Sequence, residues 1–425
     1  MSDTIPQFQV PEGAILAPSG SDTDRILCCA LDVAQLTLKC GGEIQRVEET
    51  VLRICRAYGA AHVEVFAISS WLNAALRMPD GTYSMQMRRI YNTYHDLGQL
   101  EGCNALSRRI CRETPDFDEI QEELARLKRK KSYSLWLVLL GAALTGGGFT
   151  IFFNGTLRDG LVSALISMLL ILMDRRGFRF ANQIARTLLC ALLGGLMSYA
   201  AVRIGLGEHS DTIMIGTIMI LIPGLALGTS LRDLLCDDTL SGIMRLIRSL
   251  LLAIVIALGY SGGIYLLGTG ELFSYTFNTP VGMLITSVSA SLGVGLTFGV
   301  LPRRLPLAAL GGIMTCGIYL LMGNVFDGEF FPNLIATAAV ALFCELCARV
   351  MHLPATVICL PALMPLLPGG ALYCAMNALL IGRFDVAGEY GVKTVVIALG
   401  IAAGQVAVSL AMTAYRSLRE PKIQQ

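Results

Sequence analysis

Charged residues gathered just after a long apolar run could hold an ion or pass on a proton. Arg232 and Asp233 are followed by Asp237, Asp238 and Arg245, so acids and bases mix over a short stretch of chain. One interpretation is an ion-pair cluster that responds to protons or gates the passage of a solute. The alternative is a solvated loop with ordinary ion pairs, each worth little. The residue types leave both interpretations open.

A single acidic residue, Glu345, lies inside an apolar run at about 332–350. An ionisable group in a membrane helix is costly and usually has a function. Arg349 follows four residues later and could simply pair with it on the same helix face. Our hypothesis is therefore that Glu345 is a coupling residue that carries a proton during transport. The alternative is that it only forms a structural ion pair.

A third charged group flanks a Gly-Gly helix start near the N-terminus. It consists of Glu43, Arg46 and Glu48. These side chains could contact inner loops of a membrane region and gate it. The alternative is a solvated helix face.

The first 131 residues hold most of the charge and predict a separate small α+β domain. Residues 1–21 are rich in Pro, Gly and Ser and are expected to be disordered. Residues 22–131 are expected to contain helices and a β-hairpin. In that hairpin Tyr83, Met85 and Met87 alternate with polar residues, which gives one buried and one wet face.

The composition of the whole chain is that of a membrane protein. Of its 425 residues, 54% are hydrophobic and 15% are charged, and its mean hydropathy is +0.61. Soluble domains carry roughly 25% charged residues, so too little polar surface is present to wrap a soluble core. A net charge of +1 gives no indication of a nucleic-acid partner. The pair Cys344 and Cys347 has no second pair, and we expect no metal and no cofactor.

The region after residue 131 predicts an all-α membrane domain of ten spans, because a spanning helix needs about 20 apolar residues. The ten apolar runs lie at about 134–153, 157–173, 184–203, 212–230, 244–267, 281–300, 306–323, 332–350, 355–380 and 392–414. We divide them into a first five-helix part at 132–272 and a second part at 273–425, which ends in a short tail.

The distribution of basic residues predicts the orientation of these spans. With the N-terminus inside, most loop arginines fall on the inner side, as the positive-inside rule requires. The exceptions are Arg158, Arg203, Arg383 and Lys393. Both termini and the α+β domain are thus expected in the cytoplasm, with the chain in the cell membrane.

An internal repeat marks a predicted pathway through the membrane. The segments 221–227 and 366–372 share five of their seven residues, including Pro223-Gly224 in the first and Pro368-Gly369 in the second. Two halves of five helices must enter the membrane in opposite senses, as in many secondary transporters. Broken helices free backbone groups that cannot face lipid and should line a cavity. The alternative is that each Pro-Gly merely kinks a structural helix.

Taken together, these motifs resemble the threonine/serine exporter family over nearly the whole chain past residue 25. The residues that carry the resemblance are Gly42-Glu43, Arg46-Val47-Glu48, Ile220 to Gly224, Arg232-Asp233, Asp237, Ser241-Gly242, Arg245, Pro354, Pro361 and Pro368-Gly369. The resemblance implies proton-driven export of threonine and serine, with protons, a small polar metabolite and the lipid bilayer as partners. It adds Pro361 to the expected substrate pathway.

Two other functions stay open beside this one. Split two-chain relatives are associated with export of dicarboxylates such as succinate, and the doubled acid at Asp238 leaves the choice of substrate undecided. A membrane-anchored enzyme or sensor would use residues 22–131 as its active module. Ten helices with an inverted repeat exceed what an anchor needs, so we expect a transporter and not an enzyme. The sequence does not decide whether the chain forms a homo-oligomer.

Overall fold

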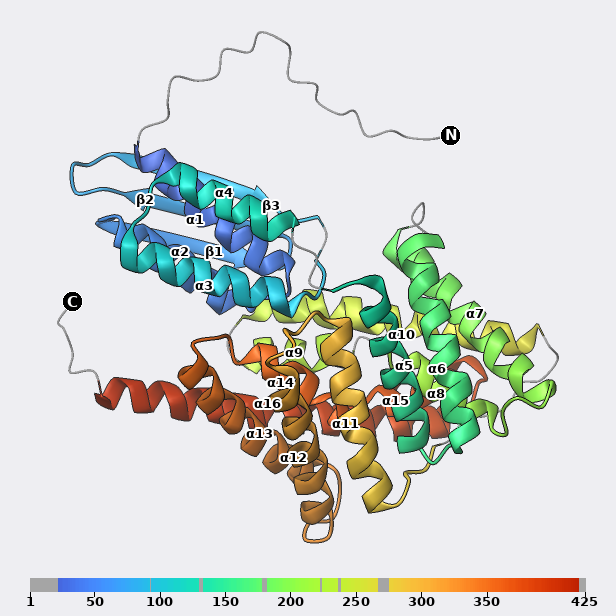
Figure 1. Cartoon of the computed structure of the whole chain (residues 1–425). Coiled ribbons are helices and arrows are strands. Elements are labelled where there is room, and N and C mark those ends of the chain that lie inside the picture. Colours follow the sequence, from blue (N-terminus) through green and yellow to red (C-terminus); the bar gives the residue numbers. More distant parts are fainter. Residues whose placement is uncertain are drawn as a thin grey trace.

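The chain folds into a small α+β domain and a larger helical region, which lie side by side in Figure 1. The computed structural model describes residues 22–91, 93–129, 133–177, 182–221, 224–235, 238–266 and 275–419.

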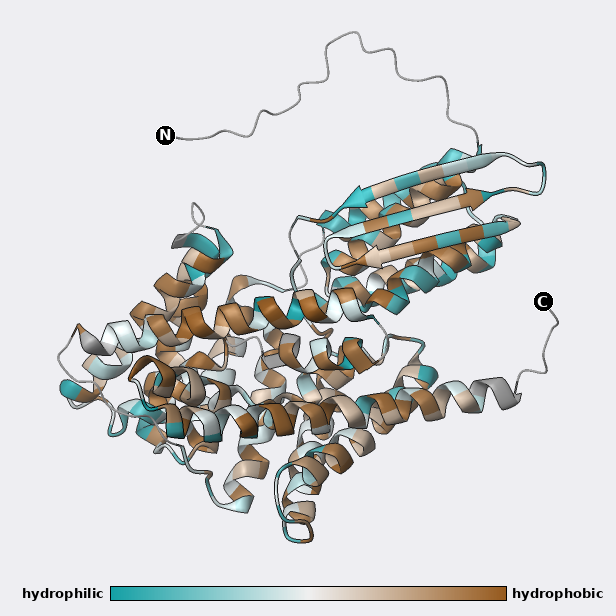
Figure 2. Ribbon diagram, turned by 180° about the vertical axis from the view of Figure 1, so that it is seen from behind, coloured by the Kyte–Doolittle hydropathy of each residue, from teal (hydrophilic) through white to brown (hydrophobic). Residues whose placement is uncertain are grey.

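The α+β domain is a three-stranded antiparallel sheet with helices on one face. Its elements are α1 (Asp22–Lys39), α2 (Ile44–Ala57), β1 (His62–Ile68), β2 (Trp71–Arg77), β3 (Tyr83–Arg89), α3 (Leu97–Glu113) and α4 (Phe117–Arg129). The strands pair in the order β1-β2-β3. Figure 2 shows that the other face of the sheet is uncovered.

Strand β3 has two distinct faces, but the apolar side chains lie on the open one. Tyr83, Met85 and Met87 are exposed, whereas Ser84 is buried against α1. The Ser84 hydroxyl donates a hydrogen bond to the Asp24 carboxylate at 2.5 Å. The expectation that apolar residues take the buried face therefore fails here, because polar partners on α1 satisfy the inward side chains of β3.

The helical region contains twelve numbered α-helices within the described residues. They are α5 (Leu135–Phe152), α6 (Leu157–Leu172), α7 (Gln183–Arg203), α8 (Ser210–Ile218), α9 (Gly224–Leu235), α10 (Thr239–Tyr265), α11 (Pro280–Thr297), α12 (Leu305–Gly323), α13 (Phe330–Met351), α14 (Thr356–Ala362), α15 (Gly369–Leu380) and α16 (Phe384–Arg419). Figure 2 shows that these helices are hydrophobic on most sides, as expected of helices in lipid.

Seven helices in the described part of the chain are long and apolar enough to cross a membrane, namely α5, α7, α10, α11, α12, α13 and α16. Helix α14 and the segment Met364–Leu380 meet at a bend of 42° and could form an eighth span. The expected spans at 157–173 and 212–230 correspond to α6, with 16 residues, and to the short helices α8 and α9. The ten-span prediction is therefore not confirmed.

Helices α5 and α11 run antiparallel to each other. At one end the Tyr133 hydroxyl, just before α5, donates to the carbonyl of Val300, just after α11. At the other end Asn278, before α11, donates from Nδ2 to the carbonyl of Ile151 at 2.8 Å. The two helices that open the predicted halves therefore enter the bundle in opposite directions.

Small residues allow α5 and α11 to approach closely where they cross. A Cβ atom added to Gly141 would lie 2.7 Å from the Gly293 carbonyl oxygen and 2.8 Å from Thr297 Oγ1. One added to Gly293 would lie 2.7 Å from the Gly141 carbonyl oxygen and 2.5 Å from Thr145 Oγ1. The contact is reciprocal, because each helix supplies one glycine and one threonine to the same crossing. We call these four residues the glycine–threonine crossing.

Two other helix pairs, α7 with α10 and α13 with α16, also pack through glycine. A Cβ added to Gly263 on α10 would lie 2.7 Å from the carbonyl oxygen of Leu192 on α7. One added to Gly404 on α16 would lie 2.6 Å from the carbonyl oxygen of Leu334 on α13. Small side chains permit this close backbone approach, which drives helix association in lipid.

The α+β domain docks on one end of the helical bundle. The backbone amide of Leu97 donates to the carbonyl of Phe298 at 2.8 Å, and Glu101 pairs with Arg304 at 3.1 Å. Asn104 donates to the carbonyl of His352, which follows the end of α13. Since α13 has 22 residues, its first turn lies roughly 30 Å from this docked end.

Candidate functional site

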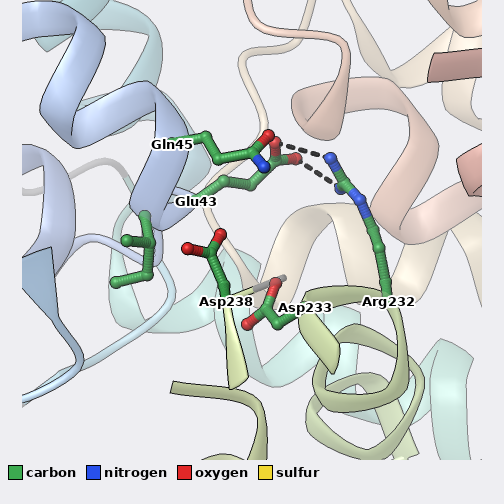
Figure 3. Close-up of a pocket in the computed structure, with 6 residues that line it drawn as sticks. Glu43, Gln45, Arg232, Asp233 and Asp238 are labelled. Carbon is green, nitrogen blue, oxygen red and sulfur yellow. Dashed lines mark hydrogen bonds and ion pairs between the residues drawn. The ribbon is translucent and has the colours of Figure 1, made fainter. Parts of the chain in front are cut away.

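The start of α2 meets the end of α9 through a two-pronged ion pair (Figure 3). Glu43 is the residue before α2, and its side chain does not cap that helix. Its two carboxylate oxygens instead accept hydrogen bonds from the Arg232 guanidinium at 2.8 and 2.9 Å. Each side chain is about one-fifth exposed. Paired, partly desolvated groups of this geometry form one of the stronger protein ion pairs.

The next residue of α9 makes a second ion pair on another side of the helix. Successive helix residues point about 100° apart, so Arg232 and Asp233 face different neighbours. Asp233 pairs with Arg245 of α10 at 2.9 Å, and its side chain is only 9% exposed. The end of α9 is therefore attached both to the α+β domain and to α10. We call Glu43, Arg232, Asp233 and Arg245 the interface cluster.

The interface cluster gives its two carboxyl groups opposite electrostatic settings. Burial would raise the pKa of Glu43, but the Arg232 guanidinium outweighs burial and lowers that pKa to about 2. Burial raises the pKa of Asp233 to about 6, although Arg245 and Arg232 act in the lowering direction. Glu43 thus stays ionised near neutral pH, while Asp233 can take up a proton in mild acid. The cluster borders a small pocket of about 200 Å³, a volume that includes space open to solvent.

The other residues that the sequence singled out in this region lie in several different places. Pro223 and Asp237 lie outside the described residues, and Gly224 is the first residue of α9. The positive charge of Arg46 helps to lower the pKa of Glu43. Glu48 accepts a hydrogen bond from the Ala67 amide at 2.9 Å, so its carboxylate joins α2 to β1 within the α+β domain.

Glu345 and Arg349 do not form the ion pair that their spacing allowed, since none joins them in the described part of the chain. Arg349 instead reaches α16, with its guanidinium 3.5 Å from Met412 Sδ and 5.6 Å from the centre of the Tyr415 ring. Glu345 is partly buried on α13. Its coupling role stays a prediction.

The second break in the bundle, between α14 and α15, borders a larger pocket of about 410 Å³ that includes space open to solvent. Pro368 precedes α15 and lines this pocket, whereas Gly369 and Pro361 are buried and lie outside its wall. The lining residues are Phe152, Phe153, Tyr275, Phe277, Tyr319, Glu329, Asn333, Pro365, Leu366, Leu367, Pro368, Gly370, Ala371, Lys393 and Ile397. We call this the aromatic pocket.

An ion pair in the wall of the aromatic pocket was not predicted as a site. Glu329, at the start of α13, pairs with Lys393 of α16 at 3.1 Å. The Tyr319 hydroxyl donates to the Glu329 carboxylate at 2.9 Å. A signal existed in the sequence, because Lys393 is one of the few basic residues on the wrong side of the positive-inside pattern.

Comparison with known proteins finds two family models that together cover most of the chain. The model of the family described as "Putative threonine/serine exporter" matches residues 29–267, and that described as "Threonine/Serine exporter, ThrE" matches residues 283–411. A "Probable threonine/serine exporter" of Mycobacterium tuberculosis is 25% identical over 382 residues, covering 84% of this chain and 70% of the relative.

A "Threonine/serine exporter" of Corynebacterium glutamicum is 24% identical over 279 residues, which cover 62% of this chain and 55% of that relative. The chain therefore spans little more than half the length of this second relative. No solved structure matches the chain. Because the first family model alone spans more than half of the sequence, the chain belongs to the threonine/serine exporter family.

Proposed function

We propose that this protein exports threonine and serine across the cell membrane, driven by protons, through alternating access of two inverted five-helix halves. The observation that carries the proposal is a helix break that borders the aromatic pocket, where the Glu329–Lys393 ion pair lies in an otherwise apolar helix bundle of an exporter family. Backbone freed by such a break cannot face lipid, and an aqueous path satisfies it.

The helix arrangement supports the inverted repeat. Helices α5 and α11, which would be equivalent, run antiparallel, as inversion requires. Gly146 of α5 faces Ser167 of α6, and Ser291 of α11 faces Gly312 of α12. The separation along the chain from Gly146 to Ser291 equals that from Ser167 to Gly312, and also that between the two Pro-Gly pairs.

The packing of the two broken segments supports the same repeat. Helix α9 packs against α16, and α15 packs against α10. Each expected broken span therefore lies against the last helix of the opposite half. An exchange of this kind is what a two-fold relation between halves produces, and it would let one half move against the other.

The interface cluster supports a gating role for the α+β domain, which we place in the cytoplasm. A movement of α9 must either carry the α+β domain along or break the Glu43–Arg232 pair. Protonation of Asp233 would weaken its attraction to Arg245 and so loosen α9 from α10. We infer that Asp233 senses the proton whose movement drives export.

Efflux from sealed vesicles tests this function. Purified full-length protein is placed in liposomes preloaded with labelled threonine or serine, and release is followed with and without an imposed pH difference. We expect faster release than from protein-free liposomes, and a further increase with the pH difference. Release that equals the protein-free rate under both conditions, for both amino acids, would rule out the proposal.

A further inference from the structure

We propose that the aromatic pocket binds the zwitterion of an α-amino acid, with Glu329 receiving its ammonium group and Lys393 its carboxylate. This inference rests on the proposed export function and adds the site of recognition. It comes from the charge arrangement of the pocket, in which one anion and one cation stand side by side in an apolar wall.

The Glu329–Lys393 ion pair lies where a ligand in the aromatic pocket could contact both of its charges. Its side chains are 23% and 31% exposed, and both line the same pocket. Two hydrogen bonds hold Glu329 in position. The Tyr319 hydroxyl donates to its carboxylate at 2.9 Å, and Asn333 Nδ2 donates to its backbone carbonyl at 2.7 Å. The carboxylate is thus held in place while its contact with Lys393 can be exchanged for a ligand.

Aromatic rings that suit an ammonium group also line the pocket, beside the ion pair. Lys393 Nζ lies 5.6 Å from the centre of the Tyr275 ring, which shows that a cation already occupies a ring face here. The Phe153 and Phe277 rings meet the Tyr275 ring edge to face, with centroids 5.2 and 5.5 Å from that of Tyr275. Cations over aromatic faces are stabilised most when water is excluded.

The start of α15 provides a second attraction for a carboxylate. Gly370 and Ala371, in the first turn of α15, line the pocket, and the amide groups of a helix N-terminus attract anions. Gly370 also keeps the wall open, because an added Cβ would lie 3.4 Å from the Phe153 ring and 3.6 Å from Tyr275. The positive helix end and Lys393 together favour a carboxylate on this side.

These features select a ligand that carries both charges. In the free protein Glu329 and Lys393 satisfy each other. A zwitterion can enter between them and give each a new partner, so no charge is left unpaired in the apolar wall. A dicarboxylate would meet Glu329 with a like charge, and an amine without a carboxylate would leave Lys393 unpaired. Such unpaired, desolvated charges are expensive, which is how a polar site rejects an incomplete ligand.

Equilibrium binding to the full-length protein in lipid nanodiscs tests the assignment. The probe is radiolabelled threonine, with unlabelled threonine, serine, N-acetylthreonine, threoninamide and succinate as competitors. We expect threonine and serine to compete well. The three ligands that lack one of the two charges should each bind at least about tenfold more weakly, the usual effect of losing a charged hydrogen-bond partner.

Single substitutions locate the two charges. Glu329→Gln and Lys393→Met should each weaken threonine binding about tenfold or more. Glu329→Gln should also erase the preference for threonine over N-acetylthreonine, and Lys393→Met the preference over threoninamide, changes that misfolding cannot mimic. Asp385→Asn is the matched control, since Asp385 pairs with Arg383 in an exposed ion pair outside the pocket wall, at 3.2 Å. It should bind threonine as the wild type does.

The outcomes separate this inference from the proposed function. If both variants bind threonine with wild-type affinity and selectivity while vesicle efflux continues, the inference is wrong and the export function stands. If succinate displaces threonine as well as serine does, the zwitterion assignment is also wrong. If wild-type liposomes release neither amino acid, the export function itself fails, whatever the pocket binds.

Discussion

The interface cluster and the aromatic pocket place charged pairs in two different settings. Glu43 and Arg232 join two domains through a two-pronged contact, whereas Glu329 and Lys393 join two helices beside an open space of about 410 Å³. The first pair borders a smaller space of about 200 Å³, lined by charged, amide and aliphatic side chains. The second borders a larger space with aromatic walls. The difference teaches that a partly buried ion pair can hold two domains together or face a space that admits a ligand, and that the size and lining of the adjacent space distinguish the two.

The largest effect is expected from a substitution that prevents folding and so disrupts both the interface cluster and the aromatic pocket. Gly293→Val places a branched side chain where even an added Cβ would lie only 2.7 Å from the Gly141 carbonyl oxygen. Backbone cannot yield easily, so the helices α5 and α11 must separate, at a cost of about 3 kcal/mol or more. We expect little folded protein by fluorescence-detected gel filtration. Gly388→Val is the control, since nothing lies within 4 Å of a Cβ there. Normal folding of Gly293→Val would show that the crossing is not tightly packed.

The next effect should appear at the interface cluster alone. Arg232→Met leaves the Glu43 carboxylate without its main partner, which should cost about 2–3 kcal/mol of stability. A double-mutant cycle with Glu43→Gln, read by thermal unfolding in detergent, measures the coupling. Arg53→Met, in an exposed pair with Glu49, should cost under about 0.5 kcal/mol. Threonine binding by Arg232→Met should stay near wild type. A large loss of affinity would mean that the two regions are not separate.

The two carboxyl groups of the cluster should also give opposite pH dependences. The pKa of Glu43 is lowered to about 2 from 4.5, so the stability from Glu43 is present above pH 4.5 and is lost as the pH falls toward 2. The pKa of Asp233 is raised to about 6 from 3.8, because burial favours its neutral form. The stability that the folded state gains by binding this proton is therefore full below pH 3.8 and is lost as the pH rises through 6.

Unfolding measured from pH 2 to 8 can separate these two effects, because the Glu43 effect lies below pH 4.5 and the Asp233 effect is largest near pH 6. Asp233→Asn should flatten the decline of stability with rising pH near 6, and should remove a step in the efflux rate near the same pH. Glu43→Gln should leave that step in place. A step that persists in Asp233→Asn would assign it to another group, and the proton-sensing role would be lost.

The smallest effect should be confined to the aromatic pocket. Tyr319→Phe removes one hydrogen bond to the Glu329 carboxylate but keeps the ring, so about 1 kcal/mol should be lost. We expect the KM for threonine efflux to rise about fivefold with little change in thermal stability. Tyr415→Phe, far from the pocket on α16, is the control. An unchanged KM in Tyr319→Phe would mean that Glu329 does not need this support.

The sequence predicted the interface cluster better than the pocket for a physical reason. Arg232, Asp233 and Arg245 are close together in the chain and follow an apolar run, so their grouping is visible without a fold. Glu329 and Lys393 are ordinary loop and helix-end residues in the sequence. Only the packing of α13 against α16 brings them together, and no local pattern encodes that contact.

The sequence also did not predict which residues Arg349 contacts or which face of β3 is buried. The spacing of Glu345 and Arg349 allowed a pair, but a nearby Met412 and Tyr415 on α16 give the arginine other contacts. Alternation in β3 correctly predicts two faces, while the buried one depends on polar groups of α1 that no period reveals. The N-terminal α+β domain and its separation from the apolar region follow from the uneven charge.

The glycine–threonine crossing has a consequence for how the gene can vary. Gly141 and Thr297 fill one corner of the contact, and Thr145 with Gly293 fills the other. A bulkier residue at one position leaves no room unless its counterpart shrinks. In an alignment of many relatives these four columns should therefore covary, so that the first and second halves of the chain cannot drift apart independently in evolution.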